Sequence, residues 1–104
     1  RLSTIAPTTT RLLPNYPNPL NPEMWAPFGL SEDADVAVTI YDALGWVVRR
    51  INLGQQAAGV YGAQTRAAYW DGRNARGEPM ASGAYFAELT AGKHRETRRV
   101  VLLK

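Results

Sequence analysis

The sequence predicts a single all-β domain, an antiparallel β-sandwich of about seven short strands. Six or seven segments rich in β-branched and aromatic residues recur about every ten residues and are separated by glycine-containing turns. No window carries a useful stripe of apolar residues at a period of 3.6, which excludes a helical bundle. Parallel α/β folds are excluded as well, because no crossover helix is available.

The composition is that of one small globular domain. The chain has 104 residues, of which 45% are hydrophobic and 20% charged, and this size suits one core. Cysteine is absent, so neither a disulfide framework nor a thiolate metal site can form. No apolar run approaches the roughly 18 residues of a membrane-spanning helix, so we expect no transmembrane segment. Because the chain begins at Arg1 without a methionine or signal peptide, we expect a piece of a longer protein.

Residues 1–22 are expected to form a proline-rich lead-in, and residues 23–104 the domain itself. Four prolines fall within residues 14–22. Proline fixes φ, lacks an N–H group and holds the preceding residue in extended geometry, so the stretch suits neither a helix nor a central strand. We therefore predict an extended, partly stiff linker. Its candidate recognition residues are Leu13, Pro14, Asn15, Pro17, Asn18, Pro19, Asn21 and Pro22.

The first half of the domain has the pattern of successive strands. Pro27 interrupts an apolar segment over residues 24–30, which predicts a strand at a sheet edge. Apolar residues then alternate over residues 36–41, the period of a half-buried strand. Residues 42–45 end in glycine and suit a tight turn between antiparallel neighbours, and the β-rich run 46–48 begins the next strand.

The second half continues this pattern to the end of the chain. Residues 67–70 form a short strand that leads into the turn-forming pair Asp71-Gly72. Alternation returns over residues 84–89, and a second glycine-containing turn covers residues 90–93. A final strand then ends in the apolar run 100–103.

Positive charge is concentrated in the second half of the chain. The net charge is +3, with −1 in residues 1–52 (four basic, five acidic) and +4 in residues 53–104 (eight basic, four acidic). A cationic face attracts acidic partners, but nucleic-acid binders show denser clusters with interleaved aromatics, so we expect no nucleic-acid partner. The favoured interpretation is a solvated face of the final strand, formed by Arg95, Arg98, Arg99 and Lys104.

Trp70 is the strongest candidate for the central core side chain. A buried indole contributes roughly 150–250 Å² of contact, and its N–H then needs a partner that a nearby backbone carbonyl can provide. The alternative is an exposed platform on which a sugar stacks.

The turn that follows Trp70 carries oxygen ligands at Asp71, Asn74 and Glu78. Calcium is one hypothesis for this turn, although the spacing does not match an EF-hand loop and two arginines lie inside it. The favoured interpretation is that Asp71 and Asn74 hydrogen-bond the backbone of their own turn.

The remaining candidates are aromatic anchors rather than catalytic groups. Trp25 and Trp46 are candidate exposed anchors for a partner or a glycan, although single exposed aromatics are also ordinary. His94 is the only histidine and falls at a predicted hairpin tip between basic neighbours. The serines lack the setting of an activated nucleophile, and no glycine-rich loop meets a helix. We therefore expect no enzyme, no cofactor and no catalytic residue.

Four motifs resemble a known family of bacterial domains. Residues 13–22 resemble an "LxPNYPNPFNP" opening, residues 40–45 an "IYDxxG" hairpin, residues 70–86 a "WDGRNxxGxxVxSGxYF" segment, and residues 101–104 its closing strand. The family is the FlgD-like immunoglobulin-like domain, related to the C-terminal sorting domains of type IX (Por) secretion. The motif residues of the domain are Tyr41, Asp42, Gly45, Trp70, Asp71, Gly72, Asn74, Gly77, Ser82, Gly83 and Tyr85.

The resemblance implies both a fold and a function. It implies an Ig/fibronectin-III-like sandwich that serves as a noncatalytic C-terminal module of a larger secreted bacterial protein. The module would direct type IX-type export or cell-surface attachment, with the upstream domains of its parent and the secretion machinery or a surface protein as partners. The alternative is an adhesion or assembly module that binds another protein through its surface or an edge strand; carbohydrate binding through Trp25 or Trp46 is less favoured. Leu20 stands where the family usually has phenylalanine, and residues 25–28 replace its usual Thr-x-Ile pattern.

Overall fold

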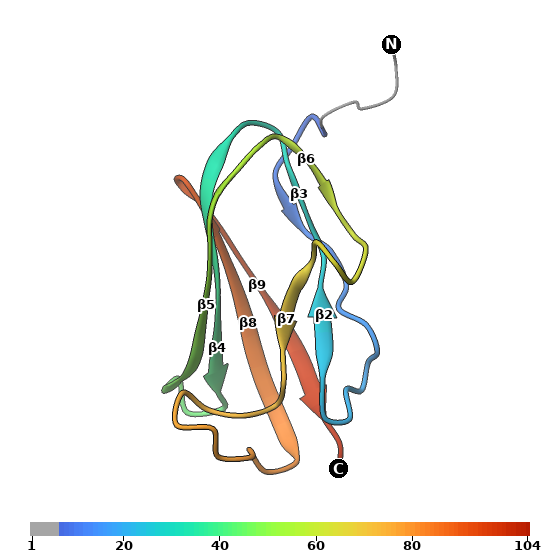
Figure 1. Ribbon diagram of the computed structural model, residues 1–104. Helices are drawn as coiled ribbons and strands as arrows, with labels where there is room; N and C mark the ends of the chain where they lie inside the picture. The colour runs from blue at the N-terminus through green and yellow to red at the C-terminus, as the bar shows by residue number, and fades with distance from the viewer. Residues whose placement is uncertain (1–6) are drawn as a thin grey trace.

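The computed structural model describes residues 7–104 as a sandwich of two antiparallel layers (Figure 1). One layer is a four-stranded sheet in the order β5 (Val47–Gln56), β4 (Ala34–Asp42), β8 (Gly83–Ala91) and β9 (His94–Leu102). The facing layer consists of two small sheets. The first has the order β1 (Arg11–Leu12), β3 (Phe28–Leu30) and β6 (Gly59–Tyr61), and the second pairs β2 (Met24–Ala26) with β7 (Ala68–Trp70). The predicted all-β antiparallel sandwich is confirmed.

The core lies between the two layers. The large sheet contributes alternate residues of β4 and β8, whose side chains point inward at every second position as the sequence pattern predicted. Among residues 7–104 there is no helix of the length and apolarity that a membrane span requires. The largest fully buried side chains are Trp70, Phe28, Leu12, Leu20, Met24, Leu30, Ile40, Leu89, Leu102, Val36, Val38 and Val100.

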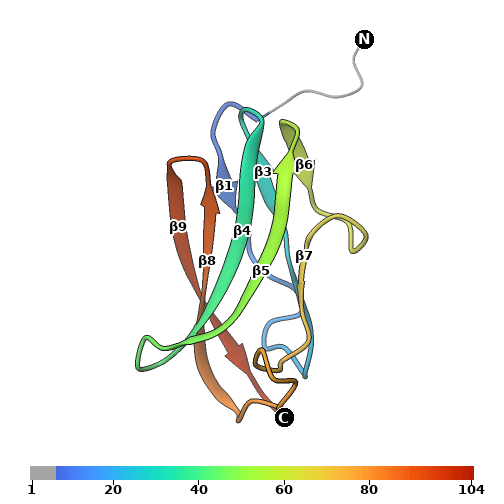
Figure 2. The same ribbon diagram turned by 60° about the vertical axis from the view of Figure 1, so that its left-hand side comes forward.

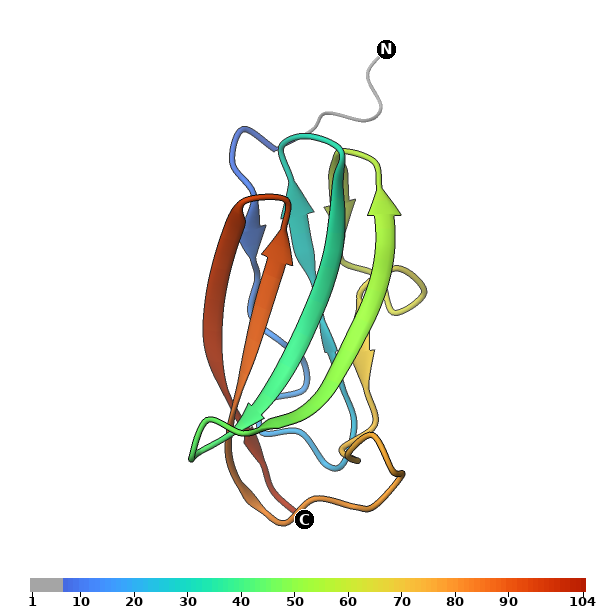
Figure 3. The same cartoon turned by 90° about the vertical axis from the view of Figure 1, so that its left-hand side faces the viewer.

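The two predicted hairpins of the large sheet are present (Figures 2 and 3). In the β4–β5 turn, the Asp42 carboxylate accepts hydrogen bonds from the backbone N–H groups of Leu44 and Trp46, both at 2.9 Å. Gly45 closes this turn with φ +89°, a conformation that side-chain-bearing residues rarely adopt. The register of the hairpin is therefore set by an aspartate cap and a glycine at the two ends of the turn.

The prediction of a strand at a sheet edge is right for only part of the segment interrupted by Pro27: residues 24–26 form one strand of a two-stranded sheet, whereas residues 28–30 form the central strand of a three-stranded sheet. The proline divides the segment into β2, which pairs with β7, and β3, which lies between β1 and β6. The Pro27 carbonyl accepts a hydrogen bond from the backbone N–H of Leu13 at 2.9 Å. A residue without an N–H group is tolerated here because the chain crosses between two small sheets at this point.

Residues 1–6 of the predicted lead-in lie outside the described residues. The described part, residues 7–22, is not a linker, and the expected boundary at residue 22 does not separate it from the domain. Leu12 is 1% exposed and Leu20 is fully buried. Leu20 lies beside β9, where its N–H donates to Val101 and its carbonyl accepts from Leu103, both at 2.9 Å. The prolines prevent a long regular strand, but the leucines between them gain burial by docking on the sandwich.

Residues 8–10 and Lys104 lie at opposite ends of the sandwich (Figure 1). The lead-in runs from one end to the other along the facing layer, and β9 runs in the same direction in the large sheet. Their single β-bridge, between Leu20 and Leu102, is accordingly parallel.

Candidate functional site

Trp70 is a core residue, as the sequence predicted. Its side chain is 1% exposed, and its indole Nε1–H donates to the Arg73 carbonyl at 2.9 Å. The Tyr85 ring packs edge-on against it, with 5.5 Å between the ring centroids. A stacking platform for a sugar requires an accessible ring face, so this alternative for Trp70 is excluded.

The corner after Trp70 packs on the last residue of the lead-in. Gly72 has φ +78°, and a Cβ added there would lie 2.5 Å from the backbone oxygen of Pro22. Both the backbone conformation and the close approach require glycine at this position. The Trp-Asp-Gly motif and the proline-rich motif are therefore two sides of one contact.

The polar side chains of the following turn have hydrogen-bond partners within the turn and on β5. The Asp71 carboxylate accepts from the N–H of Arg73 at 3.0 Å and from the Arg49 guanidinium at 3.4 Å. The Asn74 side-chain oxygen accepts from the N–H groups of Arg76 and Glu78 at 2.9 and 3.0 Å, and its amide donates to the Glu78 carboxylate at 2.7 Å. These residues do not converge on a common point, and no group of three or more acidic, histidine or cysteine side chains in residues 7–104 could hold a metal ion.

We predict that chelation leaves the stability of the domain unchanged. The oxygen atoms of the turn already accept hydrogen bonds from N–H groups of the same turn. The turn therefore does not need calcium to hold its conformation. Thermal unfolding with excess EDTA and with millimolar calcium should give the same Tm. A rise in Tm with calcium that Asn74→Ala removes would contradict this prediction.

The other motif residues around the core are also structural. The Tyr85 hydroxyl donates to the Ala81 carbonyl at 2.6 Å, and the Tyr41 hydroxyl donates to Glu88 at 3.0 Å. The Ser82 hydroxyl accepts from the N–H of Lys104 at 3.0 Å. Gly77 and Gly83 have positive φ values of 85° and 157°. These residues shape turns and strand ends, and Tyr41 also lines a small open pocket together with Arg50, Glu88 and Arg95.

Trp25 and Trp46 differ in exposure. Trp25 is half-buried between two tyrosine rings, with ring centroids 6.0 Å from Tyr16 and 5.4 Å from Tyr69, so the prediction of an exposed Trp25 is wrong. No local pattern indicates that the lead-in tyrosine covers it. Trp46 is 71% exposed, and its role as an anchor stays a prediction.

Trp46 is part of an exposed apolar tip on the β4–β5 hairpin. Leu44 is 84% exposed and Val47 61% exposed. The N–H groups of Leu44, Gly45 and Trp46 all donate to oxygens of Asp42. Because these donors are satisfied internally, the tip can enter an apolar environment without leaving them unpaired. We call residues 44, 46 and 47 the apolar tip.

The lead-in and the last strand form one continuous surface. Besides the Leu20 contacts, both backbone polar groups of Leu12 are bound by β9 side chains: its N–H donates to Glu96 at 2.8 Å, and its carbonyl accepts from Arg98 at 3.0 Å. Two side chains of β9 thus take the place of a backbone ladder between the layers. The lead-in and the last strand are thus held together at two places, Leu12 and Leu20.

Glu96 is the titratable group at this junction. Burial alone would raise its pKa, but the hydrogen bond from the Leu12 N–H, followed by His94 and Arg11, holds the pKa of Glu96 below its ordinary value of 4.5. His94 Nε2 lies 3.3 Å from the Glu96 carboxylate, and Arg11 Nε lies 3.8 Å from it. Folding therefore favours the charged form of Glu96.

We predict that Glu96→Gln lowers the free energy of unfolding by about 1 kcal/mol at neutral pH, since a charge-assisted hydrogen bond becomes a neutral one. A carboxyl group whose pKa is depressed by folding stabilises the native state above its unfolded pKa and loses that contribution as the pH falls through its folded pKa. The difference between wild type and variant should thus be full above about pH 5.5 and shrink below about pH 4.5. Urea unfolding over this pH range measures it, and a constant difference would contradict the assignment.

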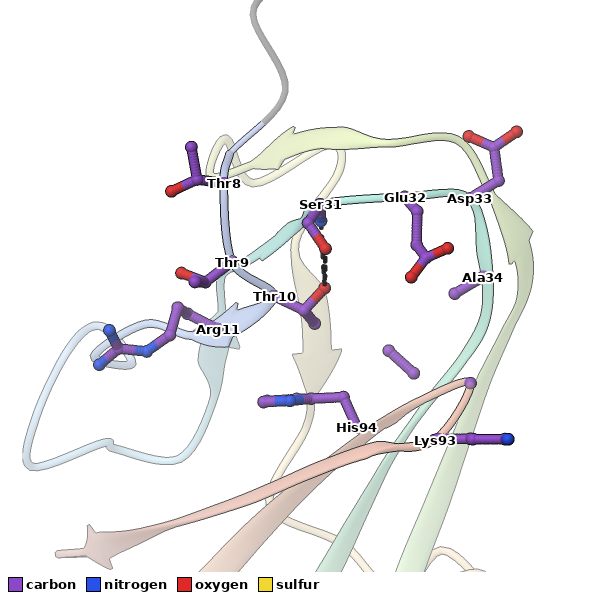
Figure 4. A pocket seen from close by; sticks show the side chains of 12 residues that line it. Thr8, Thr9, Thr10, Arg11, Ser31, Glu32, Asp33, Ala34, Lys93 and His94 are labelled. Carbon is purple, nitrogen blue, oxygen red and sulfur yellow. Dashed lines mark hydrogen bonds between the residues drawn. The ribbon is translucent and has the colours of Figure 1, made fainter.

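An open groove lies at the end of the sandwich where the lead-in enters (Figure 4). Residues 8–11, 31–34 and 91–94 line it, and its volume is about 820 Å³. The Thr10 and Ser31 hydroxyls hydrogen-bond each other at 3.1 Å, and Asp33 accepts from the N–H of Ala58 at 2.8 Å. Its walls come from three distant parts of the sequence, so no local pattern predicted it.

Comparisons with known proteins agree with this geometry. The family model described as the FlgD Ig-like domain matches residues 23–94. FlgD from P. aeruginosa is 35% identical with a TM-score of 0.59, and the match covers 76% of this chain and 57% of that one. No curated protein matches the chain significantly.

Two solved structures from Porphyromonas gingivalis share the fold at lower identity. Dimeric latent PorU is 17% identical with a TM-score of 0.69, over 98% of this chain and 10% of PorU. PorZ, described as an essential bacterial surface component of the type-IX secretion system, is 21% identical with a TM-score of 0.58, over 89% of this chain and 11% of PorZ. The chain thus spans little more than half of FlgD and about a tenth of the other two proteins. On its sequence and its fold, the chain belongs to the FlgD Ig-like domain family.

Proposed function

We propose that this domain is a noncatalytic module that directs type IX-type export of a larger secreted bacterial protein or attaches that protein to the cell surface. The observation that carries the proposal is the junction of the lead-in with β9, where Leu20 bonds to Val101 and Leu103. This junction places the two motif-bearing segments in one folded surface that a receptor can bind. The likeness to domains of PorU and PorZ supports a role in the same kind of system.

A noncatalytic role agrees with the chemistry of the polar side chains. His94 contacts Glu96, whose carboxylate already accepts the Leu12 N–H. The groove hydroxyls of Thr10 and Ser31 bond to each other. A hydrolytic site needs a nucleophile next to a base that a third group orients, and this pairing supports structural roles instead. The partners we propose are the upstream domains of the parent and the secretion machinery or a surface protein outside the cell.

Export of a fused reporter tests the proposal. Residues 1–104 are joined to the C-terminus of a periplasmic reporter in a bacterium with a type IX system, and surface delivery is measured by protease accessibility. Asn18→Ala changes an exposed position of the lead-in, and Asn52→Ala is the matched control on β5. We expect the wild-type fusion and the control to reach the surface, and Asn18→Ala to remain in the periplasm with an unchanged Tm. Retention of the wild-type fusion in the periplasm would overturn the proposal.

The apolar tip favours a second candidate function, an assembly module that binds another protein. Exposed tryptophan and leucine side chains are frequent anchors of protein interfaces when they enter an apolar pocket. Cross-linking with the upstream domains of the parent measures such binding. Trp46→Ser should abolish a specific complex, whereas Val60→Ser, at a side chain that is 54% exposed on β6, should leave it intact.

A further inference from the structure

The outer edge of β9 carries backbone groups that no strand pairs with over most of its length. The backbone of Val101 and Leu103 points away from β8, because these residues bond to Leu20. Backbone direction alternates along a strand, so the N–H and C=O groups of Arg95, Thr97 and Arg99 point the same way. In the described part of the chain these groups have no hydrogen-bond partner, and β9 is the outermost strand of its sheet (dark red in Figure 3).

This edge already accepts a parallel strand at one end. The bonds from Leu20 to Val101 and Leu103 form a short parallel ladder around Leu102. Farther along, the lead-in contacts the side chains of Glu96 and Arg98 through Leu12, not the outward backbone of β9. The lead-in therefore leaves the edge from Arg95 to Arg99 open.

The open edge is also the most cationic part of the chain. Residues 93–104 contain five basic residues and one acidic residue, Glu96, a net charge of +4. The other 92 residues contain seven basic and eight acidic residues, a net charge of −1. Arg95 and Arg99 are exposed and lie two positions either side of Thr97, so both point from the outer face of the sheet. Arg95 lies 3.7 Å from Glu88, and within residues 7–104 Arg99 has no ion-pair partner.

We propose that the β9 edge from Arg95 to Arg99 binds an acidic extended peptide segment as a fifth strand of the large sheet. The peptide backbone bonds to the outward groups of Arg95, Thr97 and Arg99, as in other cases of strand addition. Acidic side chains four positions apart on the peptide face Arg95 and Arg99, because residues two and four apart share one face of a strand. This interaction does not depend on the export role proposed above.

Arginines on an edge strand discourage pairing with most other strands. Here the same arginines favour one class of partner, a strand with acidic side chains. A basic or neutral strand gains nothing from Arg95 and Arg99, whereas an acidic strand gains both the backbone ladder and two ion pairs. If charge alone held the peptide, removing its backbone hydrogen bonds to β9 would leave its affinity unchanged. The backbone and charge contributions are separable by experiment.

An NMR titration of the 15N-labelled chain tests the proposal. The probe is a capped nine-residue peptide in which glutamate alternates with valine, and the control peptide has lysine in place of glutamate. We expect the acidic peptide to shift the amide resonances of Arg95, Thr97 and Arg99 most strongly and to slow their hydrogen exchange. The lysine peptide should leave them unchanged.

Variants separate the two contributions. Thr97→Pro removes an outward N–H without breaking the β8–β9 ladder, and we expect peptide affinity to fall at least tenfold. A probe N-methylated at alternate residues gives the same test without altering the protein. Arg99→Glu should weaken binding by a similar factor, whereas Arg76→Glu, the same charge change on the distant turn, should have little effect. Equal loss with Arg76→Glu, or tight binding of the N-methylated peptide, would overturn the proposal.

Discussion

Trp70→Ala should lower the free energy of unfolding by about 3–5 kcal/mol, the range found when a large buried aromatic is truncated. The indole is 1% exposed, packs against Tyr85 and donates its N–H to Arg73. Its removal leaves a cavity between the layers and deprives the turn of the hydrogen bond that fixes its first residues. Urea unfolding monitored by circular dichroism measures the loss.

Trp46→Ala is the matched control for this substitution. The same side chain is removed from a position that is 71% exposed, so the free energy of unfolding should change by no more than about 0.5 kcal/mol. Equal losses for the two variants would show that the core does not centre on Trp70.

A chain shortened to begin at Glu23 should lose its cooperative unfolding transition. This truncation removes the buried side chains of Leu12 and Leu20, each of which contributes about 2–5 kcal/mol on the scale of leucine-to-alanine substitutions. Their summed contribution approaches the whole stability of a small domain. It also exposes Leu102 and leaves the backbone of Val101 and Leu103 without Leu20. Thermal scans should show a broad transition in place of a sharp one.

Single substitutions keep this prediction testable if the shortened chain does not fold. Leu20→Ala should lower the free energy of unfolding by about 2–5 kcal/mol. Leu103→Ala removes the same atoms from a side chain that is 53% exposed and should have a small effect. A shortened chain as stable as the full one would restore the linker interpretation of residues 1–22.

The parts of the fold that follow from local pattern were predictable from the sequence. Alternating apolar residues located β4 and β8, and glycine after a polar turn located both hairpins. The core position of Trp70 followed from its place between a short strand and a tight turn. These features depend on neighbours within a few residues, which a sequence displays directly.

The features that depend on distant partners were not predictable in the same way. Prolines correctly indicated that residues 14–22 form no regular strand, but Leu12 and Leu20 dock on β9, more than 80 residues away. Pro27 correctly indicated a break, but only the positions of β1, β6 and β7 show that the break joins two sheets. Trp25 is covered by Tyr16 through a contact that no local pattern contains.

The parallel pairing of the lead-in with β9 has a mechanical consequence. A load applied between the two ends of the sandwich pulls the lead-in one way and β9 the other, along their common axis. The Leu12 and Leu20 contacts with β9 would then be sheared together instead of being peeled one at a time. Under such a load the domain would resist unfolding most strongly along its long axis.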